Sequence, residues 1–150
     1  MTVCFDTNVL AYAIDATAGH RHTRAVEIVR NVTESREAVL ILQTAAEFYA
    51  VATRKLATTP DDARSFLARL RVVLPVHGAA EPDLDHAITA TQRHGMSFWD
   101  AMLWATADRI GVRYLLTEDF QDGRTLGGVT FVDPFKAENE RLLAEILPSP

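Results

Sequence analysis

Four carboxylic acids stand directly after predicted strands or near the start of predicted helices: Asp6, Glu47, Asp100 and Asp119. In open α/β sheets, ligands bind outside the carboxyl ends of the strands, so side chains at these positions can meet at one edge. Neither histidine nor cysteine accompanies the four acids in the sequence. A set of oxygen donors suits Mg²⁺, or Mn²⁺, better than Zn²⁺. Such ions activate a water molecule and neutralise charge on a phosphoryl group.

Each of these acids also has a structural explanation. Residues 44–47 and 97–100 both fit the capping-box pattern, in which an acid three residues after Ser or Thr caps the start of a helix. Asp6 could cap the helix that follows it, and Asp119 or Asp122 could hold a turn. For any one acid taken alone, the structural explanation is the stronger one.

The surroundings of Asp100 weaken that explanation. Its neighbours on the same helix face are Leu103, Trp104 and Ala107, so the carboxylate lies on an apolar stripe. Asp6 likewise follows an apolar run directly. A buried carboxylate is costly unless it is paired or bound to a cation. Because converging carboxylates repel one another, the pattern favours a shared divalent cation.

The elements that must position these acids alternate along the chain. The hydrophobic pattern predicts strands at 3–5, 38–42, 72–76, 114–117 and 130–132, and helices at 9–14, 21–31, 44–58, 60–71, 83–94, 97–109 and 136–147. This alternation predicts an α/β protein with a parallel sheet covered by helices.

The composition is that of one globular domain. The chain has 150 residues, 48% hydrophobic and 23% charged, and a net charge of −5. That size can bury a core without disulfides, and that charge argues against wrapping of nucleic acid by charge alone. We expect Cys4 in the core, together with Trp99 and Trp104.

The hydrophobic runs and the N-terminal segment bear on the protein's location. No apolar run approaches the ~20 residues that span a bilayer, and no basic segment precedes an apolar one at the N-terminus. We therefore expect a cytoplasmic protein without membrane contact.

Four segments together resemble the PIN-domain family, and within it the VapC-type toxins. They are Phe5–Leu10, Gln43–Phe48, Ser97–Ala101 and Leu115–Phe120, and the closing Asp133-Pro134-Phe135 is similar as well. Each motif alone is common, but the four in this order make a specific signal. The resemblance runs from Val3 to about Phe135.

The resemblance implies a three-layer α/β/α fold and an acidic site that binds Mg²⁺, with Mn²⁺ as an alternative. Its catalytic and metal-binding residues would be Asp6, Glu47, Asp100 and Asp119. Supporting positions would be Thr7, Asn8, Thr117 and Asp122, the last as an additional acid.

The resemblance also implies a function. VapC-type toxins belong to type II toxin–antitoxin pairs and cleave RNA phosphodiesters with metal-activated water. They form homodimers and are neutralised by a cognate antitoxin protein. Residues 1–135 would form the PIN-like nuclease domain, and residues 136–150 a C-terminal helix and tail on the same domain.

Other functions fit less well. No strand is followed by the glycine-rich turn of a Rossmann or P-loop enzyme. A phosphohydrolase that forms an aspartyl phosphate needs a second Asp where this chain has Asn8. The remaining alternative is a catalytically silent PIN-like module that binds RNA or a protein partner without cutting.

Overall fold

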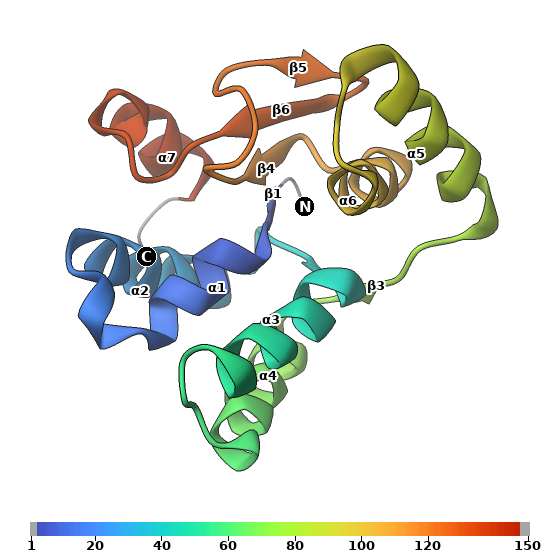
Figure 1. Cartoon of the computed structure of the whole chain (residues 1–150). Coiled ribbons are helices and arrows are strands. Elements are labelled where there is room, and N and C mark those ends of the chain that lie inside the picture. The colour runs from blue at the N-terminus through green and yellow to red at the C-terminus, as the bar shows by residue number, and fades with distance from the viewer. Residues whose placement is uncertain (1–2, 148–150) are drawn as a thin grey trace.

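The computed structural model describes residues 3–147 and contains a central sheet with short strands. The strands are β1 (Val3–Phe5), β2 (Leu40–Ile41), β3 (Val76–His77), β4 (Tyr114–Leu116), β5 (Thr125–Leu126) and β6 (Val129–Val132). The main sheet has the order β1-β4-β6-β5, in which β1, β4 and β6 are parallel and β5 is antiparallel to β6 (Figure 1). The parallel pair β2 and β3 extends this sheet beyond β1 through a bridge between Val3 and Ala38.

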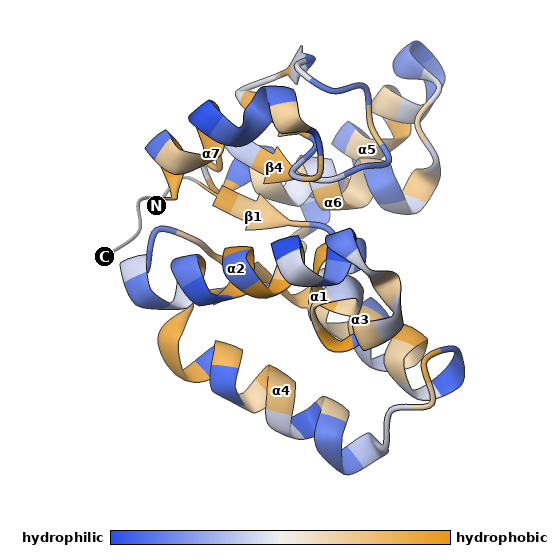
Figure 2. Ribbon diagram, turned by 90° about the vertical axis from the view of Figure 1, so that its left-hand side faces the viewer, coloured by the Kyte–Doolittle hydropathy of each residue, from blue (hydrophilic) through white to orange (hydrophobic). Residues whose placement is uncertain are grey.

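Helices cover both faces of the sheet. They are α1 (Thr7–Ile14), α2 (His20–Ser35), α3 (Leu42–Arg54), α4 (Pro60–Val73), α5 (Glu81–His94), α6 (Phe98–Arg109) and α7 (Glu140–Ile146), with 3₁₀ turns at Ala16–Ala18 and Ala137–Asn139. Helices α1 to α4 lie on one side of the sheet and helices α5 and α6 on the other (Figures 1 and 2). The expected α/β class with a parallel sheet between helix layers is therefore confirmed.

The alternation of side chains along the strands produces two separate cores. Val3 and Phe5 of β1 belong to the core that contains residues of α1 to α4 and α7. Cys4 belongs to the second core, with residues of α5 and α6, and is fully buried as expected. Figure 2 shows the hydrophobic strand β1 next to α2, whose ribbon carries both hydrophobic and hydrophilic segments. The short strands are thus held by burial on both faces.

Several boundaries differ from the sequence-based expectation. The strand expected at 72–76 is wrong for its first residues, because α4 continues to Val73 and β3 starts at Val76. Pro75 explains the break: a residue before proline disfavours the helical region, and Leu74 is extended, with φ −108° and ψ 135°. The edge strand β5 was not expected, because two residues carry too little pattern to be recognised.

The start of α3 is a second difference. This helix begins at Leu42, so Thr44 lies inside it and is not its N-cap. The Thr44 hydroxyl instead donates to the Phe5 carbonyl at 3.1 Å, which ties α3 to the end of β1. The expected capping box at 44–47 and the placement of Glu47 in the first helical turn are therefore wrong.

The two tryptophans of α6 have opposite environments. Trp104 is 3% exposed and its indole N–H donates to the Leu126 carbonyl at 3.0 Å, so the expected core position is confirmed. Trp99 is 63% exposed, so the expectation for this residue is wrong. It lies in the first turn of α6, which protrudes beyond the part of the helix that the core encloses. Within residues 3–147, no helix combines the length and the hydrophobicity that crossing a membrane requires.

Candidate functional site

The carboxyl ends of β1 and β4 bring Asp6 next to Thr117. Phe5 pairs with Leu116 in the parallel register, and the Asp6 N–H donates to the Leu116 carbonyl at 2.9 Å. One residue beyond β4, the Thr117 hydroxyl donates to Asp6 Oδ2 at 3.0 Å. Asp6 Oδ1 accepts from the Thr7 N–H at 2.6 Å. Asp6 therefore caps α1 and faces the end of β4 at the same time, so the structural and functional explanations are compatible.

Asp119 is held beside Asp6 by the loop after β4 and by α1. Its N–H donates to the Thr117 hydroxyl oxygen at 3.1 Å, which closes a short turn. Its Oδ2 accepts from Asn8 Nδ2 at 2.6 Å. One hydroxyl, that of Thr117, thus contacts both Asp6 and the backbone of Asp119. The sequence-predicted positions 8, 117 and 119 are brought together.

Glu47 reaches the same edge from the second turn of α3. Its Oε2 accepts from the Thr7 hydroxyl at 2.9 Å, and its Oε1 accepts from Gln43 Nε2 at 2.8 Å. Gln43 Nε2 also donates to the Trp99 carbonyl at 2.8 Å and so connects α3 with the start of α6. Gln43 is not among the predicted site residues, although its position four residues before Glu47 places both on one helix face.

Asp100 lies in the first turn of α6, where Ser97 is the N-cap and its hydroxyl accepts from the Asp100 N–H at 3.4 Å. Among the hydrogen bonds of residues 3–147, none involves the Asp100 carboxylate. Its charge nevertheless acts on both Asp6 and Asp119 and raises the pKa of each. The Asp100 carboxylate is therefore near enough to Asp6 and Asp119 for its charge to act on both.

We call Asp6, Glu47, Asp100 and Asp119 the acid cluster. Burial raises the pKa of Asp6 to about 7; hydrogen bonds from Thr7 and Thr117 oppose this, and the charges of Asp119 and Asp100 add to it. Burial also raises the pKa of Asp119, against the effect of its hydrogen bonds with Asp6 and Asn8. The acid cluster therefore favours a positive partner, whether a proton or a cation.

A hard divalent cation fits these residues in donor chemistry, because all the available ligands are carboxylate, amide and hydroxyl oxygens. The side chains are not yet arranged as a closed cage: across residues 3–147, no three His, Cys, Asp or Glu side chains form a group that could hold a metal ion. The carboxylates would have to close on the ion from the hydrogen-bonded positions described above.

Asp122, predicted as an additional acid, has its partners elsewhere. Its Oδ1 accepts from the Asp133 N–H at 2.8 Å and from Asn139 Nδ2 at 2.9 Å, and its Oδ2 lies 3.5 Å from Lys136 Nζ. These contacts connect the loop after β4 to the segment that leads into α7. Its carboxylate thus has a structural explanation that does not involve the acid cluster.

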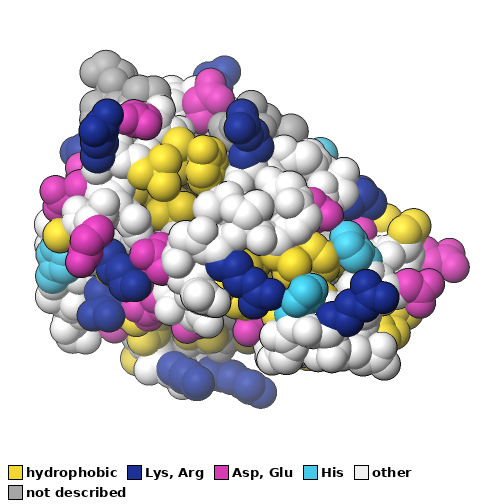
Figure 3. All heavy atoms as spheres, turned by 90° about the horizontal axis from the view of Figure 1, so that it is seen from above, with side chains coloured by type: hydrophobic (Ala, Val, Ile, Leu, Met, Phe, Trp, Pro, Cys, Tyr) yellow, Lys and Arg dark blue, Asp and Glu magenta, His cyan; other side chains and the backbone are white. Residues whose placement is uncertain are grey.

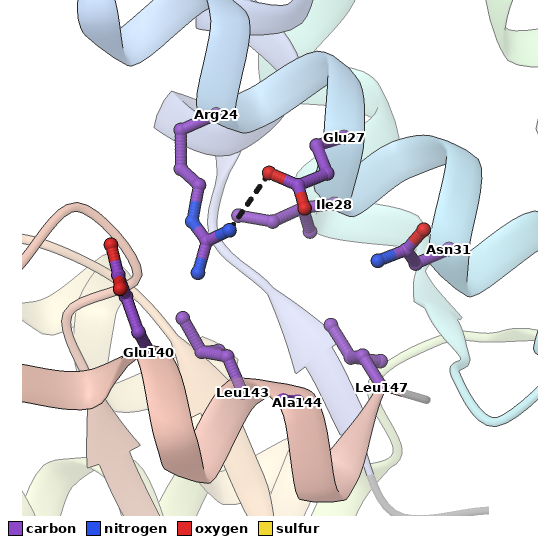
Figure 4. Close-up of a pocket in the computed structure, with 8 residues that line it drawn as sticks. All are labelled: Arg24, Glu27, Ile28, Asn31, Glu140, Leu143, Ala144 and Leu147. Atoms are coloured by element: carbon purple, nitrogen blue, oxygen red, sulfur yellow. Dashed lines mark hydrogen bonds and ion pairs between the residues drawn. The ribbon is translucent and has the colours of Figure 1, made fainter. Parts of the chain in front are cut away.

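The surface also has pockets away from the acid cluster. One, of about 420 Å³, lies between α2 and α7, and Figure 4 shows the ion pair of Arg24 with Glu27 at its rim. Asn31 faces it, and the buried Asn31 Oδ1 has no hydrogen-bond partner among the described residues. Histidine and basic side chains gather around hydrophobic ones on the face seen in Figure 3. A smaller hollow includes His86, whose ring centroid lies 4.4 Å from that of Trp104.

Solved structures with a similar fold include a toxin and a toxin–antitoxin complex. VapC20 of Mycobacterium tuberculosis, described as a sarcin–ricin loop cleaving toxin, is 19% identical with a TM-score of 0.62, over 79% of this chain and 90% of that one. A toxin–antitoxin complex from Klebsiella pneumoniae is 21% identical with a TM-score of 0.60, over 89% and 98%. FitAB bound to a DNA fragment is 18% identical with a TM-score of 0.65, over 93% and 99%. At these identities the likeness is one of fold.

The family is identified by comparison of the sequence with known proteins and family models. No protein of curated function matches the chain significantly. The family model of the PIN domain matches residues 3–121, which include all four residues of the acid cluster. This chain belongs to the PIN-domain family.

Proposed function

We propose that this protein is a Mg²⁺-dependent endoribonuclease that acts as the toxin of a type II toxin–antitoxin pair. The observation that supports this most is the convergence of Asp6, Asp100 and Asp119 at the carboxyl edge of the sheet, with Glu47 joined to it through Thr7. Helix capping alone does not explain why the charges of Asp100 and Asp119 both act on the buried Asp6.

In this proposal Asp6 and Asp100 would hold the ion, and Glu47 and Asp119 would complete its surroundings or orient the attacking water. Bound Mg²⁺, or Mn²⁺, would lower the pKa of a water molecule and stabilise the negative charge that develops on the phosphate. Asp6 must give up its proton before it can bind a cation, and Thr117 assists by donating to the charged carboxylate. Thr7 and Asn8 keep Glu47 and Asp119 in place.

The partners follow from the same proposal. The substrate is RNA, and a cognate antitoxin protein controls the activity in the cytoplasm. The similar structures include a toxin–antitoxin complex, which supports the presence of such a partner. A homodimer is supported by large apolar side chains that are exposed in the single chain, among them Leu42, Val76, Leu84 and Ile88.

A cleavage assay with purified protein tests the activity. We expect structured RNA to be cut in the presence of Mg²⁺ and to remain intact when the metal is chelated. Asp100→Asn should slow cleavage by more than about a hundredfold. Substitution of residues that only contact a metal's ligands usually lowers activity by about tenfold to a hundredfold, and loss of a ligand itself should exceed that. Asp61→Asn is the matched control, because Asp61 is an exposed acid in the first turn of α4. In cells, the wild type without antitoxin should arrest growth and Asp100→Asn should not.

The alternative, a catalytically silent module, predicts a different result. Such a protein would bind RNA or a partner, and neither Mg²⁺ nor the Asp100→Asn change would alter the RNA. Near-normal cleavage by Asp100→Asn would instead show that Asp100 is a helix-capping residue and that another group binds the metal.

A further inference from the structure

Two neighbouring acids on the loop after β4 point to different partners. Asp119 accepts from Asn8 and belongs to the acid cluster. The preceding residue, Glu118, turns away and accepts from the Tyr12 hydroxyl through Oε1 and from Arg21 Nε, at 2.9 Å, through Oε2. Asn8 and Tyr12 are four residues apart on α1 and therefore lie on one helix face. The loop is thus attached to α1 at two points, one on each acid.

The Glu118 attachment is built into a packed cluster of side chains. The Arg21 guanidinium lies 5.8 Å from the ring centre of Tyr12 and 5.6 Å from that of Phe135. The two aromatic rings pack edge to face, with centroids 5.2 Å apart. A cation over aromatic faces is held in place, and the Glu118 side chain is only 17% exposed. Glu118 therefore has fixed partners on both α1 and α2.

The attachment of Glu118 to α1 and α2 resists the electrostatic repulsion within the acid cluster. The charges of Asp6, Asp100 and Asp119 repel one another, and Asp119 is on a loop that could relieve the repulsion by moving outward. Asp119 itself is held by hydrogen bonds of its carboxylate with Asn8 and Asp6 and by the bond from its N–H to the Thr117 hydroxyl. The contacts of Tyr12 and Arg21 with Glu118 additionally hold the backbone of the residue that precedes Asp119.

We propose that Tyr12 and Arg21 are positioning residues, which act through Glu118 to keep Asp119 in the metal-binding geometry of the acid cluster. The inference rests on the proposed function, in that the acid cluster must be a cation site. Neither Tyr12 nor Arg21 needs to touch the ion or the substrate. The contacts of Glu118 with Tyr12 and Arg21 keep the site in order before the cation binds, and their loss weakens cation binding.

The test measures Mn²⁺ binding to the purified full chain by calorimetry, independently of cleavage. Tyr12→Phe removes one hydroxyl and keeps the ring, and should weaken Mn²⁺ binding about threefold to tenfold, the range expected for one hydrogen bond. Tyr49→Phe, an equivalent change on α3, is the control and should leave the affinity unchanged.

A double-mutant cycle separates positioning from a general loss of stability. In a Glu118→Ala background, Tyr12→Phe should have no further effect on Mn²⁺ affinity, because the group through which it acts is gone. A Tyr12→Phe protein that melts at a lower temperature but binds Mn²⁺ normally would overturn the proposal. The same holds for an equal loss of affinity in both backgrounds.

The outcomes also distinguish this inference from the proposed nuclease function. If the wild type binds Mn²⁺ and the cycle behaves as expected but RNA is not cut, the positioning role stands and the nuclease function fails. If RNA is cut and Tyr12→Phe binds Mn²⁺ as well as the wild type, the function stands and the positioning role fails. A wild type that binds no Mn²⁺ overturns the positioning role.

Discussion

The Thr117 hydroxyl, one residue past β4, donates to Asp6 Oδ2, one residue past β1, at 3.0 Å. The same oxygen accepts the Asp119 N–H at 3.1 Å. One side chain thus connects the two strand ends and the loop that carries a third acid. Because its hydrogen bond favours the charged form, Thr117 lowers the pKa of Asp6 against the effect of burial.

Thr117→Val should therefore raise the pKa of Asp6 above its present value of about 7. Hydrogen bonds to charged groups contribute about 1.5–3 kcal/mol, which corresponds to a shift of about one to two pH units. We expect the pH at which Mg²⁺ binding is half-maximal to move upward by that amount. Thr53→Val, which removes an exposed hydroxyl on α3, is the control. An unchanged pH midpoint would show that Thr117 does not tune Asp6.

The metal-free protein should lose stability as the pH rises. The folded-state pKa of Asp6, about 7, lies above the ordinary value of 3.8, so the folded protein retains a proton that the unfolded chain releases. The stabilisation is complete below pH ~4 and disappears as the pH rises through about 7. Urea unfolding at pH 5 and pH 8 should show the decline in the wild type and a smaller one in Asp6→Asn. A wild type that gains stability relative to Asp6→Asn over this range would contradict the prediction.

Asp100→Asn should stabilise the metal-free protein, because it removes one of the repelling charges near Asp6 and Asp119. Mg²⁺ at a hundred times its Kd should stabilise the wild type by about 2.7 kcal/mol through linkage. In Asp100→Asn that effect should largely vanish. Thermal melts of both proteins with and without Mg²⁺ provide the measurement. Equal Mg²⁺ shifts, with a lower metal-free midpoint for the variant, would show that the Asp100 charge only stabilises the N-terminus of α6.

Asp122→Ala should lower stability and leave cleavage intact. The substitution removes the side-chain acceptor of the half-buried Asp133 N–H and one of the two acceptors of Asn139 Nδ2, which also donates to the Asp133 carbonyl. Each hydrogen bond lost should cost about 0.5–1.5 kcal/mol. Urea unfolding gives the stability, and a cleavage assay well below the melting temperature gives the activity. A strong loss of cleavage with unchanged stability would instead make Asp122 a member of the catalytic set.

The sequence was most informative about topology and about the chemistry available. Alternating strands and helices predict a parallel sheet, and the parallel rule then places residues that follow strands, such as Asp6 and Asp119, at one edge. The same periodicity placed Cys4 and Trp104 in the core. It failed for Trp99, because α6 is apolar on nearly all sides and its pattern does not say which turn protrudes.

The family resemblance named Thr7, Asn8 and Thr117 as supporting positions, but only the tertiary structure shows which acid each of them contacts. Thr44 has the sequence pattern of a helix cap, but it lies inside α3. Its hydroxyl donates to the carbonyl of Phe5, 39 positions earlier. Glu118 likewise finds its partners Tyr12 and Arg21 across long stretches of chain, and Gln43, besides its neighbour Glu47, reaches the carbonyl of Trp99. A sequence pattern reports interactions within a few residues, whereas these hydrogen bonds depend on how separate elements pack. The sequence therefore determined which acids could form a site, and the packing of α1, α3 and the loop after β4 determined how they are held.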